Sequence, residues 1–283
     1  MLEGLIERLL AARDFRPQGY VPLELGAERI GWIRRDQADR LRAWPRVFEF
    51  SEKKILLRPA PEAVQSAALA EVARALARDG AIQDWRGETY AIGARAGAAP
   101  AFHLERSAMR FFGFTSSAAH LNGFVSENDD QTILIARRAS TKSIDPGMLD
   151  TLVAGGVPSG QDAWQTLLRE CGEEAGIAQS LAGRSRPAGV LQVCREVPDG
   201  VHSEFLHVFD LTLPAGFAPR NADGEVSEFM ALAADRLLER VARGEFTLEA
   251  GLVAADFILR HGLLRDADPR LGAAVERCRA PRY

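Results

Sequence analysis

Apolar residues follow a helical spacing in some tracts of the first half and alternate in others. Residues 1–15 repeat leucine and isoleucine every three or four positions, which predicts an amphipathic helix. Residues 20–36, "YVPLELGAERIGWIRRD", predict a hairpin that turns at Gly26. Residues 61–79 predict a second helix, with proline at its start and glycine just past its end. The segment "GETYAIG" (87–93) predicts a short strand.

The second half continues with strands and then helices. The expected strands are 120–125, 131–139, 188–197 and 202–214, the last two joined at Pro198-Asp199-Gly200. A loop is expected over 140–156, followed by a helix that ends at Gly176, and another loop over 221–229. Two amphipathic helices, at 232–244 and 248–264, follow.

The chain is long for one domain, since 283 residues usually form two. Small residues at 93–102, "GARAGAAPAF", suggest an exposed connection between two parts. We therefore expect an N-terminal domain over residues 1–110 and a second domain over residues 111–283.

Composition excludes several classes of function. The net charge of −4 and a pI near 5.8 give no sign of nucleic-acid binding. Three widely spaced cysteines suggest neither a disulfide framework nor a zinc site, and they favour the cytoplasm. The first residues carry charges among their leucines, unlike a signal peptide. No apolar run reaches the roughly 20 residues of a membrane span, so no membrane association is expected.

The helix before Gly176 carries a cluster of like charges. Glu170 neighbours both Glu173 and Glu174 at helical spacing, and each such pair costs roughly 0.2–0.5 kcal/mol. Gly172 lies in the same turn and costs about 1 kcal/mol relative to alanine. Clustered carboxylates are suitable ligands for magnesium or manganese bound together with substrate phosphates. Such a conflict between local preference and fold is typical of a functional site.

The segment around these glutamates resembles the Nudix box, G-x5-E-x7-R-E-U-x-E-E-x-G-U, where U is aliphatic. Gly155 opens the match, Arg169-Glu170 and Glu173-Glu174 fill the charged positions, and Gly176-Ile177 closes it. One position departs, because Gln161 stands where the family has its first glutamate. The resemblance implies an α/β (α+β) fold, a Nudix α/β/α sandwich with a small N-terminal α+β accessory domain. It implies a hydrolase acting on phosphoric anhydride bonds.

The resemblance extends over most of the chain. The segments "LNGFV", "ARRASTKSIDPGMLDTLVAGG", "FDLTLPAGFAP" and "DGEVSEF" are similar to a Nudix subfamily with an accessory domain, related to the Nudix part of fungal thiamine pyrophosphokinase fusions. This similarity implies hydrolysis of thiamine diphosphate, or of its oxo and oxy analogues, to the monophosphate. Glu170, Glu173 and Glu174 would hold Mg²⁺, with Mn²⁺ as an alternative, and Arg169 would brace them.

Other residues are candidates for binding substrate. Glycines 155 and 156 lack side chains, so backbone N–H groups there can approach a ligand. Arg138, at a strand end, is expected to clamp a phosphate, and Lys142 in the following loop to meet one as a point charge. Glu225 is expected to act as an extra metal ligand or catalytic base, with Glu228 and Glu204 as alternatives.

Three other interpretations remain open at this stage. In the first, the chain is a Nudix pyrophosphatase whose substrate is another diphosphate, such as ADP-ribose, a dinucleotide or a nucleotide sugar. Alternatively, the fold serves as a catalytically silent ligand sensor, which Gln161 leaves open. In the third, the first hundred residues form a protein-interaction module. A homodimer is also left open, and which glutamate acts as the base is not decided by the sequence.

Overall fold

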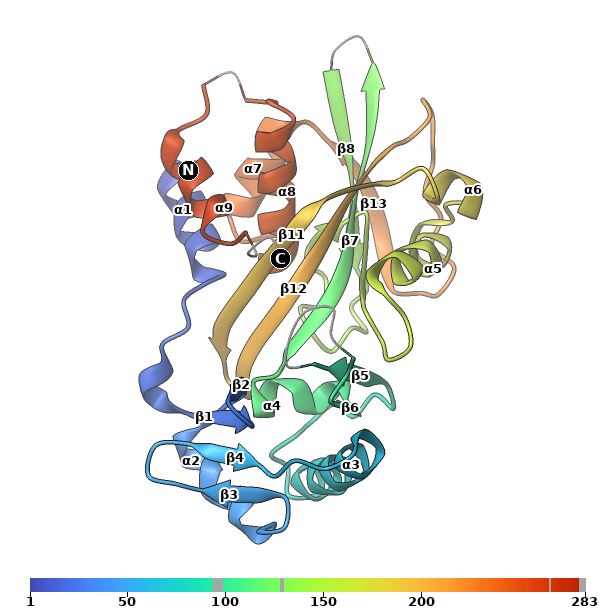
Figure 1. Ribbon diagram of the computed structural model, residues 1–283. Helices are drawn as coiled ribbons and strands as arrows, with labels where there is room; N and C mark the ends of the chain where they lie inside the picture. Colours follow the sequence, from blue (N-terminus) through green and yellow to red (C-terminus); the bar gives the residue numbers. More distant parts are fainter. Residues whose placement is uncertain (94–98, 128–129, 265, 280–283) are drawn as a thin grey trace.

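The computed structural model describes residues 1–93, 99–127, 130–264 and 266–279. Its N-terminal part contains a four-stranded sheet, a small hairpin and a long helix, in agreement with the α+β expectation (Figure 1). The sheet has the order β2-β1-β4-β3, and the hairpin pairs β5 with β6. These elements are β1 (Tyr20–Leu25), β2 (Glu28–Arg34), α2 (Arg35–Ala38), β3 (Phe48–Phe50), β4 (Ile55–Leu57), α3 (Glu62–Arg78), β5 (Thr89–Ile92), β6 (Phe102–Glu105) and α4 (Met109–Phe112).

The four predicted N-terminal elements are confirmed, including the first helix, which spans Leu2–Ala11. Strands β1 and β2 form the expected hairpin, and Gly26 at its turn has φ of 62°, which favours glycine. Helix α3 begins after Pro61 and ends before Gly80, and β5 matches the predicted short strand. Half of the expected connection at 93–102, residues 94–98, lies outside the described residues.

The second part is built on a mixed seven-stranded sheet of order β11-β12-β7-β8-β13, with β10 paired to β7 and β9 to β8. Its strands are β7 (Thr115–Glu127), β8 (Asp130–Arg138), β9 (Leu149–Thr151), β10 (Val153–Gly156), β11 (Arg186–Val197), β12 (Gly200–Thr212) and β13 (Val226–Leu232). The helices are α1 (Leu2–Ala11), α5 (Ala163–Ala175), α6 (Gln179–Ala182), α7 (Ala234–Ala242), α8 (Leu248–Arg260) and α9 (Pro269–Glu276). Single 3₁₀ turns are η1 (Pro17–Gly19), η2 (Asp39–Ala43) and η3 (Arg106–Ala108).

Helices cover both faces of this sheet, which confirms the expected sandwich (Figure 1). Successive side chains of a strand point to opposite faces, so Leu134 packs toward α5 and α6 while Ile135 packs toward α7 and α8. Helix α1 lies beside the C-terminal helices, where Leu5 and Leu9 join their core. The N-terminal sheet, α3 and α4 have a separate core. The domain division at about residue 110 stays a prediction.

Two segments expected to be loops contain strands. Residues 140–156 include β9 and β10, and residues 221–229 include the start of β13. Both corrections have the same cause: β9 and β10 are short and β13 begins two residues after Gly224, and pairing with β7 and β8 stabilises these strands where local preference does not. The strand β10 is important because it runs directly beneath the glutamate helix.

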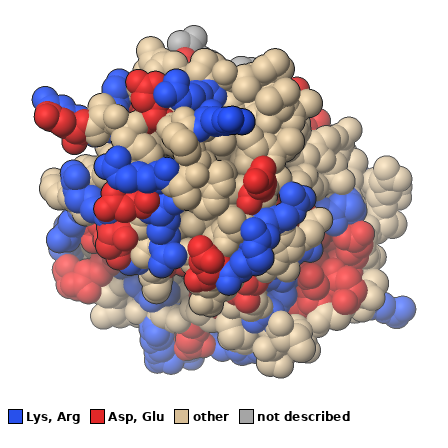
Figure 2. Space-filling view, turned by 90° about the horizontal axis from the view of Figure 1, so that it is seen from below, with Lys and Arg blue, Asp and Glu red and all other residues tan. Residues whose placement is uncertain are grey.

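The surface carries both charges. Figure 2 views the molecule from the side of the N-terminal sheet, and acidic and basic side chains are mixed over this face. Within the described part of the chain, no helix is long and apolar enough to cross a bilayer.

Candidate active site

Helix α5 presents the glutamates from a well-fixed position. Asp162 and Gln165 form a capping box at its start, and Gly176 ends it with φ of 63°. Leu167, Cys171 and Ala175 are fully buried against the sheet, and Trp164 and Leu168 are partly buried beside them. The helix is thus held at both ends and along one face, which fixes the direction in which its charged side chains project.

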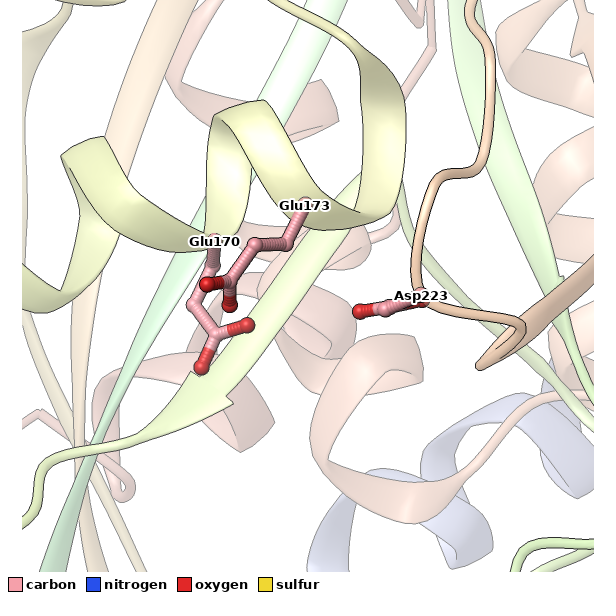
Figure 3. Close-up of side chains that lie close together, drawn as sticks. All are labelled: Glu170, Glu173 and Asp223. Carbon is pink, nitrogen blue, oxygen red and sulfur yellow. The ribbon is translucent and has the colours of Figure 1, made fainter.

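Asp223 projects from the loop before β13 toward the neighbouring carboxylates of Glu170 and Glu173 on α5 (Figure 3). Each of these carboxylates offers an oxygen that lies within 4.8 Å of the other two. The Glu170 side chain is 12% exposed and that of Glu173 is 46% exposed. Three oxygen donors at this spacing form a suitable site for a hard divalent cation.

Arg169 neutralises part of this negative charge. Its guanidinium donates to Glu173 at 2.6 Å and to Glu170 at 2.7 Å. Burial raises the pKa of Glu170, although Arg169 acts in the opposite direction. Arg169 therefore orients the two glutamates, which is the bracing that the resemblance implied, and its assignment to the site stays a prediction.

Glu174 faces a different direction. It is buried, accepts a hydrogen bond from the Ala154 N–H at 2.9 Å and lines a small cavity beside Glu225 and Lys142. Burial raises the pKa of Glu174 well above its usual range. The structure brings Glu170 and Glu173 together with Asp223 and places Glu174 behind them, so its role as a metal ligand stays a prediction.

The predicted phosphate-binding cations have partners within the chain. Arg138 donates to the Ile144 carbonyl oxygen and, at 2.9 Å, to Asp150. Lys142 pairs with Glu225 across the small cavity that Glu174 lines. Burial acts to raise the pKa of Glu225, but Lys142 outweighs it, and the pKa is lowered. The roles of these three residues in binding substrate or metal stay predictions.

The two alternatives to Glu225 also form polar contacts within the chain. Glu228 pairs with Arg137 at 2.9 Å, and Glu204 on β12 accepts a hydrogen bond from the Ser116 hydroxyl at 2.8 Å. Gln161 lies just before α5, and its side-chain oxygen accepts a hydrogen bond from the Thr166 hydroxyl at 3.2 Å. Gln161 therefore supports the start of the helix.

The two box glycines are located in β10, paired with β7, and not at the start of α5. A Cβ on Gly155 would lie 2.2 Å from a Glu170 carboxylate oxygen, and one on Gly156 would lie 1.8 Å from the Tyr90 hydroxyl. Both glycines therefore leave room for neighbouring side chains of the protein itself. Their proposed part in substrate binding stays a prediction. A Cβ on Gly172 would have no atom of the described residues within 4 Å, so no neighbouring element packs closely against this glycine.

Asp223 is the residue that the sequence did not reveal. The loop that carries it is tied to the end of α5, because the Ala222 N–H donates to the Glu173 carbonyl oxygen at 2.9 Å. The Asp223 carboxylate also accepts a hydrogen bond from the Glu225 N–H at 2.8 Å, which fixes its orientation. The turn signal "NADG" was available in the sequence, but the approach of this loop to α5 is a tertiary contact.

Comparisons with known proteins match both parts of the chain. A family model described as NUDIX domain matches residues 120–250, and a domain of unknown function, DUF4743, matches residues 5–116. The chain is 33% identical to Nudix hydrolase 24, chloroplastic, of Arabidopsis thaliana, over 88% of this chain and 70% of that protein. It is 31% identical to Nudix hydrolase 20, chloroplastic, of the same plant, over 87% and 69%.

A similar solved structure is that of DR0079 from Deinococcus radiodurans. It is 23% identical, with a TM-score of 0.43, and the match covers 68% of this chain and 99% of that one. The identity to the two plant enzymes extends through both the accessory part and the helix that carries the glutamates. Because of its similarity to these two plant proteins, the chain belongs to the Nudix hydrolases.

Proposed function

We propose that this Nudix hydrolase cleaves the phosphoric anhydride bond of a small-molecule diphosphate at the Glu170–Glu173–Asp223 cluster. The observation that supports this most strongly is the convergence of three carboxylates from two separate elements within 4.8 Å. Like charges at this spacing repel one another, and Arg169 compensates only part of the repulsion. A cluster of this kind becomes favourable when a divalent cation is bound.

The donors fit Mg²⁺, with Mn²⁺ as the alternative, because all three are carboxylate oxygens. When bound, such an ion lowers the pKa of water and neutralises charge that develops on phosphate oxygens. Glu170, Glu173 and Asp223 would hold the ion, and Arg169 would keep the two glutamates in place. Glu225, beside Glu174 in the adjoining cavity, remains our candidate for accepting the proton of the attacking water.

The proposed substrate is thiamine diphosphate or its oxo and oxy analogues, with the monophosphate and inorganic phosphate as products. Support for this choice comes from the subfamily resemblance in the sequence. The alternative is a pyrophosphatase acting on ADP-ribose, a dinucleotide or a nucleotide sugar. A cytoplasmic location, a homodimer and the lack of nucleic-acid partners also stay predictions, and the names of both plant relatives describe those proteins as chloroplastic.

A substrate screen tests this proposal. The full chain would be incubated with Mg²⁺ or Mn²⁺ and the thiamine diphosphates, ADP-ribose, NADH and a nucleotide sugar, and kcat/KM would be measured for each. We expect the thiamine compounds to be preferred. A tenfold preference for any of the other three would refute the thiamine assignment, and a lack of turnover with all of them would refute diphosphate hydrolysis at this site.

A further inference from the structure

Arg106 belongs to the N-terminal part of the chain, in the turn η3 that follows β6. Its backbone N–H donates to the Glu88 carbonyl oxygen at 2.8 Å, and its guanidinium donates to the Glu88 carboxylate at 2.9 Å. The buried Glu105 carboxylate accepts hydrogen bonds from the backbone N–H groups of Gly87 and Ser107. The backbone on both sides of Arg106 is therefore held in place, and binding of a ligand by Arg106 would cost little backbone conformational entropy.

The Arg106 guanidinium lies against the Nudix part of the chain. It is 5.5 Å from the centre of the buried Tyr90 ring, close enough for a cation–π contact. A Cβ on Gly156 would lie 3.7 Å from the guanidinium carbon of Arg106. The preceding residue, Gly155, is the one whose absent side chain leaves room for Glu170. Two consecutive residues of β10 therefore separate Arg106 from the carboxylate cluster.

Strand β10 pairs only with β7 among the described strands, so its other edge is not covered by a strand. A ligand that crosses this edge can reach groups on both faces of β10. Arg106 and Glu170 approach β10 at neighbouring residues, because a Cβ on Gly156 would lie 3.7 Å from the guanidinium carbon of Arg106 and one on Gly155 would lie 2.2 Å from a carboxylate oxygen of Glu170.

The docking of the two parts is fixed at this point. The Ser159 N–H donates to the Thr89 carbonyl oxygen at 2.8 Å, and the Ser159 hydroxyl is 2.8 Å from a ring nitrogen of His103. These contacts join β5 and β6 to the segment between β10 and α5. The distance from Arg106 to the cluster is consequently set by the fold and does not depend on a long loop.

Most of the hydrogen-bonding capacity of Arg106 is unused. Of its five guanidinium N–H groups, one donates to Glu88, and the described residues offer the side chain no second acceptor. The side chain is 40% exposed. Its acidic partner comes from its own N-terminal part, so joining the two parts by an ion pair does not explain its position. A planar guanidinium with free donors matches two oxygens of a phosphate group.

We propose that Arg106 binds non-bridging phosphate oxygens of the diphosphate substrate, so that the accessory domain contributes a substrate-binding residue to the active site. This inference rests on the proposed function of the Glu170–Glu173–Asp223 cluster. The carboxylates would hold the cation on one side of β10, and Arg106 would contact the phosphates from the other. The N-terminal part thereby acquires a role in catalysis beyond any interaction with proteins.

The test uses the full chain with Arg106→Gln and Arg106→Lys, and Arg58→Gln as the matched control. Arg58 is a half-exposed arginine of the same N-terminal part, paired with Glu49 at 3.1 Å. We expect Arg106→Gln to raise KM for the best diphosphate substrate about 10- to 100-fold, as loss of charged hydrogen bonds does. Arg106→Lys should recover only part of the loss, because lysine cannot bind bidentately. Arg58→Gln should match the wild type.

Binding of inorganic pyrophosphate separates this inference from the proposed function. With Mg²⁺ present, pyrophosphate should raise the Tm of the wild type and of Arg58→Gln, and much less that of Arg106→Gln, whether or not any diphosphate is hydrolysed. An equal rise in all three proteins, or no rise in the wild type, would overturn the role of Arg106. So would an unchanged KM together with a lower Tm for Arg106→Gln, because that combination indicates a structural role only.

Discussion

Replacing Gly155 by alanine should displace Glu170 without unfolding the protein. The added Cβ would lie 2.2–2.5 Å from three atoms of the Glu170 side chain, whereas ordinary contacts begin near 3.4 Å. Glu170 must therefore move by about 1 Å, and its 12% exposure and its bond to Arg169 restrict where it can go. A misplacement of this size costs roughly 100-fold in rate, which corresponds to about 2.7 kcal/mol of activation free energy. The assay is kcat for the best diphosphate over a magnesium titration.

Gly172→Ala is the matched control for this variant. Gly172 lies on the same helix beside the same glutamates, but an added Cβ there would contact nothing within 4 Å. Helix propensity then favours alanine by about 1 kcal/mol, so Tm should rise by about 1–2 °C with kcat unchanged. The reasoning fails if Gly155→Ala retains wild-type kcat and magnesium dependence, or if Gly172→Ala loses as much activity as Gly155→Ala.

Three other outcomes are expected. Asp223→Asn should raise the magnesium concentration for half-maximal activity about 10- to 100-fold; an unchanged titration would remove Asp223 from the site. Magnesium should raise the Tm of the wild type but not of a variant with amides at Glu170, Glu173 and Asp223, and an equal rise would place the ion elsewhere. The pKa of Glu249 lies well below its usual range, because the hydrogen bond and charge of His202 act against the raising effect of burial. The Glu249 carboxylate therefore stabilises the fold at neutral pH, and this stabilisation is lost as the pH falls below about 4. Glu249→Gln should flatten this dependence of Tm on pH, and an unchanged slope would contradict it.

The helix that carries the site was predictable because its signals are local. Its apolar residues repeat at helical spacing: Leu167, Cys171 and Ala175 are buried, and Trp164 and Leu168 are partly buried. Gly176 has the positive φ that a helix end requires. The short strands β9 and β10 were missed, since their stability comes from pairing with β7 and β8.

The site itself was only partly predictable. The helical spacing predicted two of the three converging carboxylates, Glu170 and Glu173. It did not distinguish them from Glu174, which is buried and lies outside the converging group. Asp223 joins them through a loop folded back onto α5, some fifty residues later in the chain. Arg106 lies still farther away in sequence. Contacts of this kind depend on how the two parts of the chain pack, and no periodicity in the sequence records them.

Release of inorganic phosphate from thiamine diphosphate, followed by phosphorus NMR with and without Mg²⁺, tests the proposed chemistry most directly. The wild type should release phosphate and thiamine monophosphate only when the metal is present. Glu173→Gln, at a half-exposed position whose loss relieves repulsion, should keep its fold and lose about two orders of magnitude in kcat. Wild-type turnover in Glu173→Gln, or equal turnover without a divalent ion, would contradict hydrolysis at the carboxylate cluster of α5.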